Sequence, residues 1–392
     1  MLCEARRLLA LVVFLSLGLT GCYDPPQTKA QTPPQDGYPV CITTAHGTSC
    51  IESPPKRVVT LGAGAEDWTL SLGVVPIAIE PHYWGGDAEG YLPWFRQALE
   101  AQELPLPAII SSYPELDVER LLALKPDLIL APQSGITRES FLQLSALAPV
   151  IAYPDKPWLT PVKQQVELIA KALGKEVQAE ALLKQQRAYI ARVAAENPEF
   201  NGVRLAYINA ASRVGNLSVY VTGDPRVDLL LALGFVLPPQ LSGLNASRGH
   251  FAAHIGLERA DMLDDAELLL SWYSSDKARA EVEAMAVIRR LPAMRRGRYL
   301  AITDPALVMA SSYGSLLSVK WAIPKLVPQL QQTLAEQKEN PRQYRHQDTQ
   351  TDADTGALQI QAGHRIKTGG RDDTPKNLSA TCSYPVPEPS WT

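Results

Sequence analysis

Aromatic and arginine side chains recur in the segments that follow the predicted strands of this sequence. Arginine offers a planar set of donors that keeps its charge, and Trp and Tyr offer flat faces. Such side chains would bind an anionic ligand that carries rings. The candidate ligand-binding residues are Tyr83, Trp84, Arg138, Trp158, Arg213, Arg248, Trp272, Tyr273 and Tyr313. Each of them alone could also be a packing or surface residue, so the prediction concerns the set.

Histidines would indicate the binding of a bare metal ion instead. The chain has six of them: His46, His82, His250, His254, His346 and His364. His250 and His254 are four residues apart and could share one face of a helix. Too few of the others fall in the expected folded body for a site of three histidines. No metal site is therefore assigned.

Motifs for catalysis are missing from the sequence. It has no Gly-x-Ser-x-Gly, no His-Glu-x-x-His and no Walker phosphate loop. Gly62-Ala63-Gly64-Ala65 lies between a predicted strand and a predicted helix, but it lacks the third glycine of a dinucleotide turn. Close backbone packing at a turn is the better interpretation. We therefore expect neither an enzyme nor a resident cofactor.

The N-terminal segment has the order of features that an export signal needs. Two arginines precede an apolar run from Leu8 to Leu19, which is too short to span a bilayer comfortably. Leu19-Thr20-Gly21-Cys22 resembles the bacterial lipobox, in which the cysteine thiol receives a diacylglycerol. We expect Cys22 to become a lipid anchor at a membrane surface. An ordinary secretory signal with a chance cysteine is the alternative.

Composition places the chain among ordinary globular proteins. The full chain has 392 residues, 46% hydrophobic residues and a formal net charge of -4. This length suits two domains. No basic block of the kind that binds nucleic acid is present, so that class of function is set aside.

Two cysteines stand on opposite arms of a predicted β-hairpin. The arms are Val40 to Thr44 and Thr48 to Ile51, and a two-residue turn at Ala45-His46 would place Cys41 opposite Cys50. Such a pair tends to oxidise outside the cytoplasm. We predict a disulfide, with two unpaired strand thiols as the alternative.

Short apolar runs alternate with helical stretches on both sides of a long helical region that is notched at Gly174. The strand candidates are residues 58–61, 75–79, 128–130, 150–152, 203–208, 218–222, 268–270 and 299–302. The helix candidates are residues 67–72, 89–103, 118–124, 137–147, 161–196, 227–233, 257–263, 279–288 and 317–334. This alternation predicts α/β lobes with largely parallel sheets.

The predicted organisation has a folded body between two polar segments, both expected to be disordered. Its parts are a signal peptide at 1–21, a flexible spacer at 22–38, an N-terminal α/β lobe at 39–160, a connecting helix at 161–198, a C-terminal α/β lobe at 199–335 and a polar tail at 336–392. The predicted fold class is α/β, with two three-layer lobes joined by a single long helix.

Several phrases, in order and at family spacing, resemble the bacterial iron-siderophore ABC-transporter binding proteins, a group that includes ferric enterobactin and vitamin B12 binding proteins. The resemblance runs from about Val40 to Ala335. The phrases that carry it are Pro55-Lys56-Arg57-Val58-Val59-Thr60-Leu61, Leu70-Ser71-Leu72-Gly73-Val74-Val75-Pro76, Leu116 to Leu130, Leu257-Glu258-Arg259-Ala260, Leu291 to Gly297, and Gly243-Leu244-Asn245-Ala246-Ser247, which is similar to the catecholate-binding branch.

The resemblance implies a substrate-binding lipoprotein on the extracytoplasmic face of the envelope. Its ligand would be a ferric siderophore, with the catecholate type favoured. Its partners would be an ABC permease, the ATPase subunits and the membrane that holds the lipid anchor. A cobalamin or metal-ion binder on the same scaffold is the alternative, and a tethered envelope enzyme or assembly protein is the third hypothesis.

The resemblance also implies where the permease would dock. In the family, a carboxylate on each lobe pairs with arginines of the permease, and the first-lobe position corresponds to Asp67 with Glu66 adjacent. The second-lobe position follows Leu233-Gly234-Phe235, where this sequence has no acidic residue. The second contact is therefore unassigned.

Overall fold

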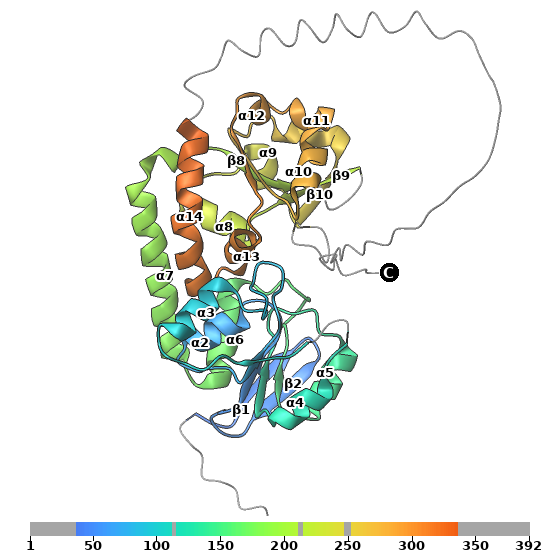
Figure 1. Ribbon diagram of the computed structural model, residues 1–392, viewed down its shortest axis with the longest axis vertical. Coiled ribbons are helices and arrows are strands. Elements are labelled where there is room, and N and C mark those ends of the chain that lie inside the picture. Colours follow the sequence, from blue (N-terminus) through green and yellow to red (C-terminus); the bar gives the residue numbers. More distant parts are fainter. Residues whose placement is uncertain (1–36, 112–114, 211–214, 247–251, 336–392) are drawn as a thin grey trace, which may run out of the picture. The chain divides into compact units, whose positions relative to one another are not determined.

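The structure is a computed structural model that describes residues 37–111, 115–210, 215–246 and 252–335 (Figure 1). The chain divides into two units, Met1–Glu339 and Asn340–Thr392, and every described residue belongs to the first of them. The predicted signal peptide, Cys22, nearly all of the predicted spacer and the predicted tail lie outside the described residues.

The first lobe is built on a five-stranded parallel sheet with the strand order β5-β4-β3-β6-β7. The strands are β3 (Val58–Thr60), β4 (Ala78–Ile79), β5 (Ala108–Ile109), β6 (Leu128–Leu130) and β7 (Val150–Ile151). All but β5 are wholly buried, which explains their continuous apolar runs. Because all five strands run in one direction, the loops that follow them leave from one edge of the sheet.

Four helices belong to this lobe. They are α2 (Ala65–Ser71), α3 (Pro93–Glu100), α4 (Val118–Leu124) and α5 (Arg138–Ser145). The side chain of Thr137 accepts a hydrogen bond from the backbone of Ser140 and so caps α5. The helix predicted for residues 89–103 is shorter than expected because Pro93 occupies its first turn, where its missing N–H costs nothing.

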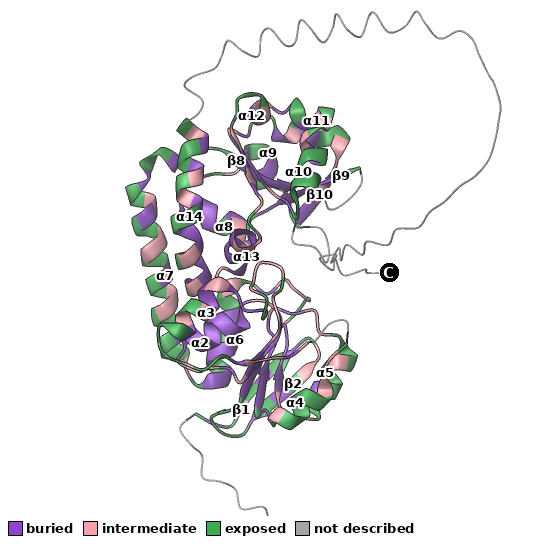
Figure 2. Cartoon of the chain, in the orientation of Figure 1, coloured by how far each residue is buried: buried purple, intermediate pink, exposed green. Residues whose placement is uncertain are grey.

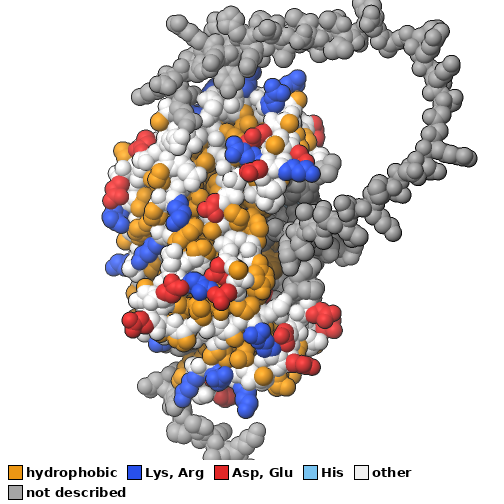
Figure 3. Space-filling view, in the orientation of Figure 1, with side chains coloured by type: hydrophobic (Ala, Val, Ile, Leu, Met, Phe, Trp, Pro, Cys, Tyr) orange, Lys and Arg blue, Asp and Glu red, His pale blue; other side chains and the backbone are white. Residues whose placement is uncertain are grey.

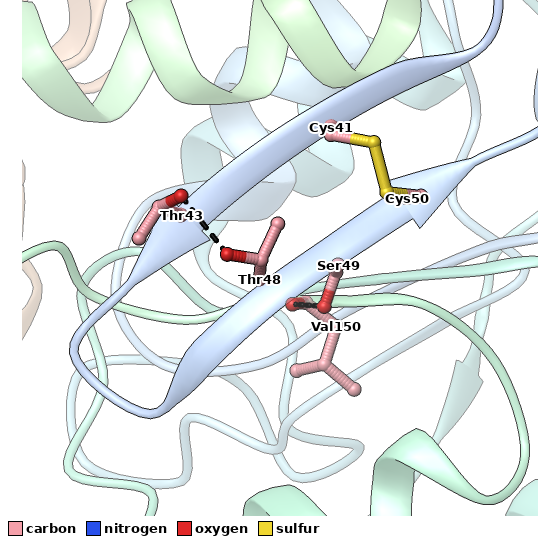
Figure 4. Close-up of a disulfide and its surroundings, with 6 residues drawn as sticks. All are labelled: Cys41, Thr43, Thr48, Ser49, Cys50 and Val150. Carbon is pink, nitrogen blue, oxygen red and sulfur yellow. Dashed lines mark hydrogen bonds between the residues drawn. A yellow bond between two sulfur atoms is a disulfide. The ribbon is translucent and has the colours of Figure 1, made fainter.

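A β-hairpin precedes the first lobe's sheet. Strands β1 (Val40–Thr44) and β2 (Gly47–Ile51) pair antiparallel around Ala45-His46, so Cys41 lies opposite Cys50 and the two form a disulfide (Figure 4). The predicted turn, register and disulfide are all present. On the other face of the hairpin, Ser49 Oγ donates a hydrogen bond to Val150 O at 2.7 Å and ties β2 to β7.

The second lobe has a mixed five-stranded sheet with the order β10-β9-β8-β11-β12. Its strands are β8 (Leu205–Asn209), β9 (Asn216–Tyr220), β10 (Ala252–Gly256), β11 (Leu268–Trp272) and β12 (Tyr299–Ile302). Strands β8, β11 and β12 are parallel, whereas β9 and β10 are antiparallel to their neighbours. Strand β10 was not predicted, since its small residues do not stand out from a loop.

The helices of the second lobe are short. They are α8 (Pro225–Ala232), α9 (Pro239–Ser242), the 3₁₀ helix η2 (Leu257–Leu263), α10 (Asp276–Glu283), α11 (Ala286–Arg289), α12 (Pro292–Arg295) and α13 (Pro305–Tyr313). Helix α13 is another element that is absent from the predicted ranges, as are β5, α9 and α12. Its apolar residues surround the helix rather than forming one stripe, so they give no helical period.

The connecting region is helical as predicted, but it is divided at Gly174. Helix α6 (Val162–Leu173) ends there, because this glycine adopts a left-handed conformation with φ 64°. Helix α7 (Glu176–Glu196) then forms the long connection between the lobes and is followed by the 3₁₀ helix η1 (Pro198–Phe200). Helix α6 itself packs into the first lobe's core.

Helix α14 (Leu316–Ala335) contacts both lobes. It lies within the range predicted for the second lobe, yet it contacts α2 and α3 of the first lobe as well as α7 and β12. One hydrophobic cluster accordingly includes Trp94 and Phe95 from α3 together with Val319 and Leu326 from α14. Buried residues are concentrated on the strands of both sheets and on α13 (Figure 2). The lobes therefore share a core along α13 and α14.

Charges of both signs are mixed on the face of the molecule shown in Figure 3, where basic and acidic side chains alternate with apolar ones. Within the residues that the structure describes, no helix has the length and apolar character needed to cross a membrane.

Candidate functional site

Two tryptophans from different lobes meet at the ends of their strands. Trp84 lies in the loop after β4, and Trp272 is the last residue of β11. Their ring centroids are 5.7 Å apart with planes tilted by 59°, and both side chains are half-buried. These rings offer flat apolar faces where the first lobe touches the second.

A series of buried polar contacts through Tyr220, Arg226 and Asp224 supports the indole of Trp272. The Trp272 indole Nε1 donates a hydrogen bond to the Tyr220 hydroxyl at 2.8 Å. The guanidinium of Arg226 lies over the Tyr220 ring, 3.9 Å from its centroid, and pairs with the Asp224 carboxylate. Since Asp224 also caps α8, the orientation of the indole is linked to the start of that helix.

Arg226 remains charged in spite of its burial. Its side chain is 11% exposed, and burial alone would lower the pKa of the guanidinium. The Asp224 carboxylate more than offsets that effect, and the pKa of Arg226 is raised overall. The cation is therefore a permanent charge beneath the aromatic surface. Sequence analysis missed Arg226 and Tyr220, although Asp224-Pro225-Arg226 carries a recognisable helix start.

A second polar cluster joins the lobes at the elbow between α13 and α14, which we define as Tyr313-Gly314-Ser315. Asp67 Oδ2 accepts hydrogen bonds from Trp94 Nε1 at 2.8 Å and from Ser315 Oγ at 2.5 Å. Close by, Glu66 Oε1 lies 3.1 Å from His82 Nε2, and the Tyr313 hydroxyl lies 3.2 Å from His82 Nδ1.

The pKa values in this elbow cluster are shifted toward retention of protons. Burial, together with the Glu66 charge, raises the pKa of Asp67 to about 8. Burial likewise raises the pKa of Glu80, which accepts a hydrogen bond from the backbone of Gly62. Burial alone would lower the pKa of His82, but the neighbouring carboxylates, Glu66 foremost, raise it overall. The cluster thus holds protons that the same groups would release in water.

The permease-docking assignment of Glu66 and Asp67 needs correction. Glu66 is 1% exposed and Asp67 is fully buried, so neither carboxylate is available to another protein. Both stand in the first turn of α2, where an acid is common and no exposure is implied. Helix α14 packs on α2, and Ser315 of the elbow, 248 residues beyond Asp67, and Trp94 of α3 both contact the Asp67 carboxylate.

Two of the predicted ligand-binding residues are buried, so their assignment also needs correction. Tyr273 is 1% exposed, packs in the hydrophobic core of the second lobe and shares a hydrogen bond with the Tyr299 hydroxyl. Tyr313 is 5% exposed and packs edge-on against Trp94 on the buried side of the elbow. Both tyrosines therefore pack inside the protein, against residues distant in the sequence that the local pattern does not show.

The remaining predicted ligand-binding residues differ in where they lie and in how exposed they are. Tyr83 is 60% exposed beside Trp84. Trp158 is half-buried in the loop after β7, and the exposed Arg138 donates a hydrogen bond to the His46 carbonyl at 3.2 Å. The structure therefore brings Trp84 and Trp272 together directly. Arg213 and Arg248 lie outside the described residues.

The possibility that His250 and His254 share a helix face does not apply, because His254 is not on a helix. His254 lies on strand β10 and its Nδ1 is 3.1 Å from Ser218 Oγ, and His250 lies outside the described residues. Over the described ranges, no group of three His, Cys, Asp or Glu side chains has the geometry to hold a metal ion.

Comparisons with known proteins agree with this architecture. At the sequence level, the Fe(3+) dicitrate-binding periplasmic protein FecB of Escherichia coli K12 is 26% identical over 61% of this chain and 74% of its own length. The ferric enterobactin-binding periplasmic protein FepB of Escherichia coli O6:H1 is 27% identical over 68% of this chain and 84% of its own length.

At the level of structure, the crystal structure of Streptococcus pneumoniae PiaA in complex with ferrichrome matches with a TM-score of 0.67 and 28% identity. The match covers 75% of this chain and 98% of PiaA. The sequence profile of the periplasmic binding protein family matches residues 93–306, which is more than half of the chain. This confirms the predicted two-lobe fold class and the family resemblance: the chain belongs to the periplasmic binding protein family.

Proposed function

We propose that this protein is the substrate-binding component of an ABC importer and that it captures a ferric siderophore. The observation that carries the proposal is the contact of Trp84 with Trp272, which places aromatic faces from both lobes at the edge where α/β sheets bind ligands. Relatives named for ferric dicitrate, ferric enterobactin and ferrichrome support the same ligand class.

Within that class we favour a catecholate. Flat catechol rings match the indole faces of Trp84 and Trp272. Arg213 and Arg248, which the sequence predicts as ligand residues, complete this part of the proposal as the cations for the net negative charge of a ferric tris-catecholate.

The proposal also covers the attachment of the protein to a membrane and the delivery of its ligand to a permease. We infer that Cys22 carries a lipid, that the protein works on the extracytoplasmic face of a membrane, and that it hands its ligand to a permease driven by ATPase subunits. Labelling cells with a radioactive fatty acid tests the anchor: the wild-type protein should incorporate label, and Cys22→Ser should not. Label retained in the Cys22→Ser variant would contradict this part.

The ligand is tested by quenching of tryptophan fluorescence with ferric enterobactin, ferrichrome, ferric dicitrate and cobalamin. We expect ferric enterobactin to bind most tightly. Trp272→Ala should weaken its binding at least about tenfold, the usual scale for an aromatic side chain at the centre of a binding surface. Trp321→Phe, on helix α14, is the matched control and should bind like the wild type.

Each outcome of these titrations leads to a different conclusion. Tightest binding of ferrichrome or ferric dicitrate would replace the catecholate with another siderophore class. Tightest binding of cobalamin would refute ferric-siderophore capture. Equal affinities of Trp272→Ala and the wild type would remove the aromatic pair from the site.

A further inference from the structure

The tip of the hairpin β1–β2 lies against loops that follow the first lobe's strands. Ala45 N donates a hydrogen bond to Tyr153 O at 3.0 Å, just beyond the end of β7. His46 Nε2 lies 3.0 Å from Ile136 O, in the loop after β6. Because a carbonyl oxygen only accepts, the proton of this hydrogen bond must reside on Nε2. One turn of the hairpin thus contacts two loops.

Ring packing and a hydrogen bond from Arg138 strengthen the contact between the hairpin turn and the two loops. The His46 ring lies 5.4 Å from that of Phe141 on α5 and 5.0 Å from that of Tyr153. The Tyr153 hydroxyl donates to the same Ile136 carbonyl at 3.3 Å. The exposed guanidinium of Arg138 donates back to the His46 carbonyl. Arg138 is a candidate ligand residue, so the hairpin determines where its charge lies.

The loop after β6 in turn holds Trp158. Trp158 N donates to Ser134 O at 3.1 Å, and the Gln133 side-chain amide donates to Trp158 O at 2.6 Å. The indole passes so close to Gly135 that a Cβ added there would lie 2.8 Å from Trp158 Cε2. Trp158 has φ 60°, a conformation that persists only where the surroundings fix it.

The hairpin is itself braced at its open end and along one face. The disulfide Cys41–Cys50 links the two strands, and Ser49 Oγ ties β2 to the Val150 carbonyl of β7 (Figure 4). Thr43 and Thr48 contact each other on the exposed side at 3.0 Å and bind no other segment in this contact. A short hairpin is only marginally stable by itself, so the disulfide and the Ser49 hydrogen bond are what allow its tip to restrain other segments.

We propose that the disulfide-closed hairpin positions the ligand-facing loops of the first lobe, residues 133–138 and 153–158, and that His46 is its positioning residue. The role rests on the proposed function, since only a ligand gives the positioned Arg138 and Trp158 their purpose. His46 does not touch the ligand. It raises the fraction of molecules whose loops are already arranged for binding, and apparent affinity scales with that fraction.

The test compares four proteins in two measurements. The proteins are the wild type, His46→Ala, His46→Gln and Thr48→Ala. The measurements are fluorescence titration with ferric enterobactin and with ferrichrome, and amide hydrogen exchange of the free proteins. His46→Ala should bind roughly fivefold to tenfold more weakly and exchange faster at residues 133–138 and 153–158.

The two other variants separate positioning from a general loss of stability. The Gln side-chain amide can still donate to Ile136 O, so His46→Gln should recover most of the affinity and of the exchange protection. Thr48→Ala is the matched control on the outward face of the same hairpin, and it should behave like the wild type. If His46→Ala fails to fold, the double variant Cys41→Ser/Cys50→Ser should show the same weaker binding and faster exchange.

Some results would overturn the inference. Unchanged affinity of His46→Ala, or unchanged exchange in both loops, would contradict a positioning role while the wild type still bound its chelate. A wild type that binds neither of these chelates nor ferric dicitrate refutes the proposed function instead. In that case the exchange measurement still decides the positioning role, because faster exchange confined to these loops in His46→Ala would uphold it.

Discussion

Stability should fall as pH rises from 5 to 8, and Asp67→Asn should remove a large part of that fall. The folded protein holds the pKa of Asp67 at about 8, against 3.8 for the free side chain. Between these values the folded state keeps a proton that the unfolded state has released. The free energy of unfolding then decreases by up to about 1.4 kcal/mol per pH unit from this group alone.

The neighbouring groups act with the same sign. Glu80 and His82 also have raised pKa values, so the stability they contribute is present at low pH and is lost as pH rises through their folded pKa values. The other polar and aromatic groups near Asp67 are Glu66 on α2, Trp94 on α3, and Tyr313 and Ser315 from the elbow. Tyr313 stays protonated throughout, since burial raises its pKa well above the usual value.

Asparagine is the suitable replacement because it cannot ionise and its oxygen can accept both existing hydrogen bonds, from Trp94 and from Ser315. Asp67→Asn should therefore be more stable than the wild type at pH 8 and show a shallower pH dependence. Urea unfolding at pH 5, 6, 7 and 8 measures both. Asp155→Asn, at an exposed residue 3.9 Å from Lys156, is the matched control. Identical pH slopes for Asp67→Asn and the wild type would contradict the account.

Gly62→Ala should destabilise the protein by roughly 3 kcal/mol, on the scale of a substitution that forces a backbone clash. Gly62 has φ 82°, and a Cβ there would run into the Gln133 carbonyl and lie 2.8 Å from Ser134 Cβ. Neither neighbour can move easily, because Ala63 N also bonds Gln133 O and Ser134 Oγ bonds Ala131 O. The loops after β3 and β6 would have to separate.

Gly73→Ala provides the control for this substitution. Gly73 has nearly the same backbone conformation, φ 81°, but no atom lies within 4 Å of an added Cβ. It should therefore show only the cost of a non-glycine residue in the left-handed region, about 1 kcal/mol. Chemical unfolding of both variants gives the two costs. A Gly62→Ala cost no greater than that of Gly73→Ala would show that the close approach at Gly62 does not matter.

Local patterns predicted the features that depend on neighbours in the sequence. The hairpin and its disulfide follow from a two-residue turn with Cys41 and Cys50 at matching positions. The close packing at Gly62 followed from a glycine turn between a strand and a helix. Even the break between α6 and α7 was marked by Gly174. In each case a few adjacent residues carry the information.

Features that depend on distant segments were predicted poorly. Helix α13 is buried on most sides, so its apolar residues show no period, and β10 consists of small residues that gain strand character only by pairing with β9. Tyr273 was predicted to face a ligand. It lies in the core instead, where its hydroxyl shares a hydrogen bond with the hydroxyl of Tyr299 on another strand. Arg226 was missed because its importance comes from stacking on Tyr220, on another element.

Local patterns and characteristic phrases were enough to predict the two α/β lobes, the long helical connection, the disulfide hairpin and the family. They were not enough to predict which polar residues face inward. Glu66 and Asp67 stand in the first turn of α2, a position where acids are often exposed, but Ser315, 248 residues beyond Asp67, donates a hydrogen bond to the Asp67 carboxylate. Burial and the pKa shifts that it causes depend on all the chain segments that meet at one point, so the local pattern of any one segment does not show them.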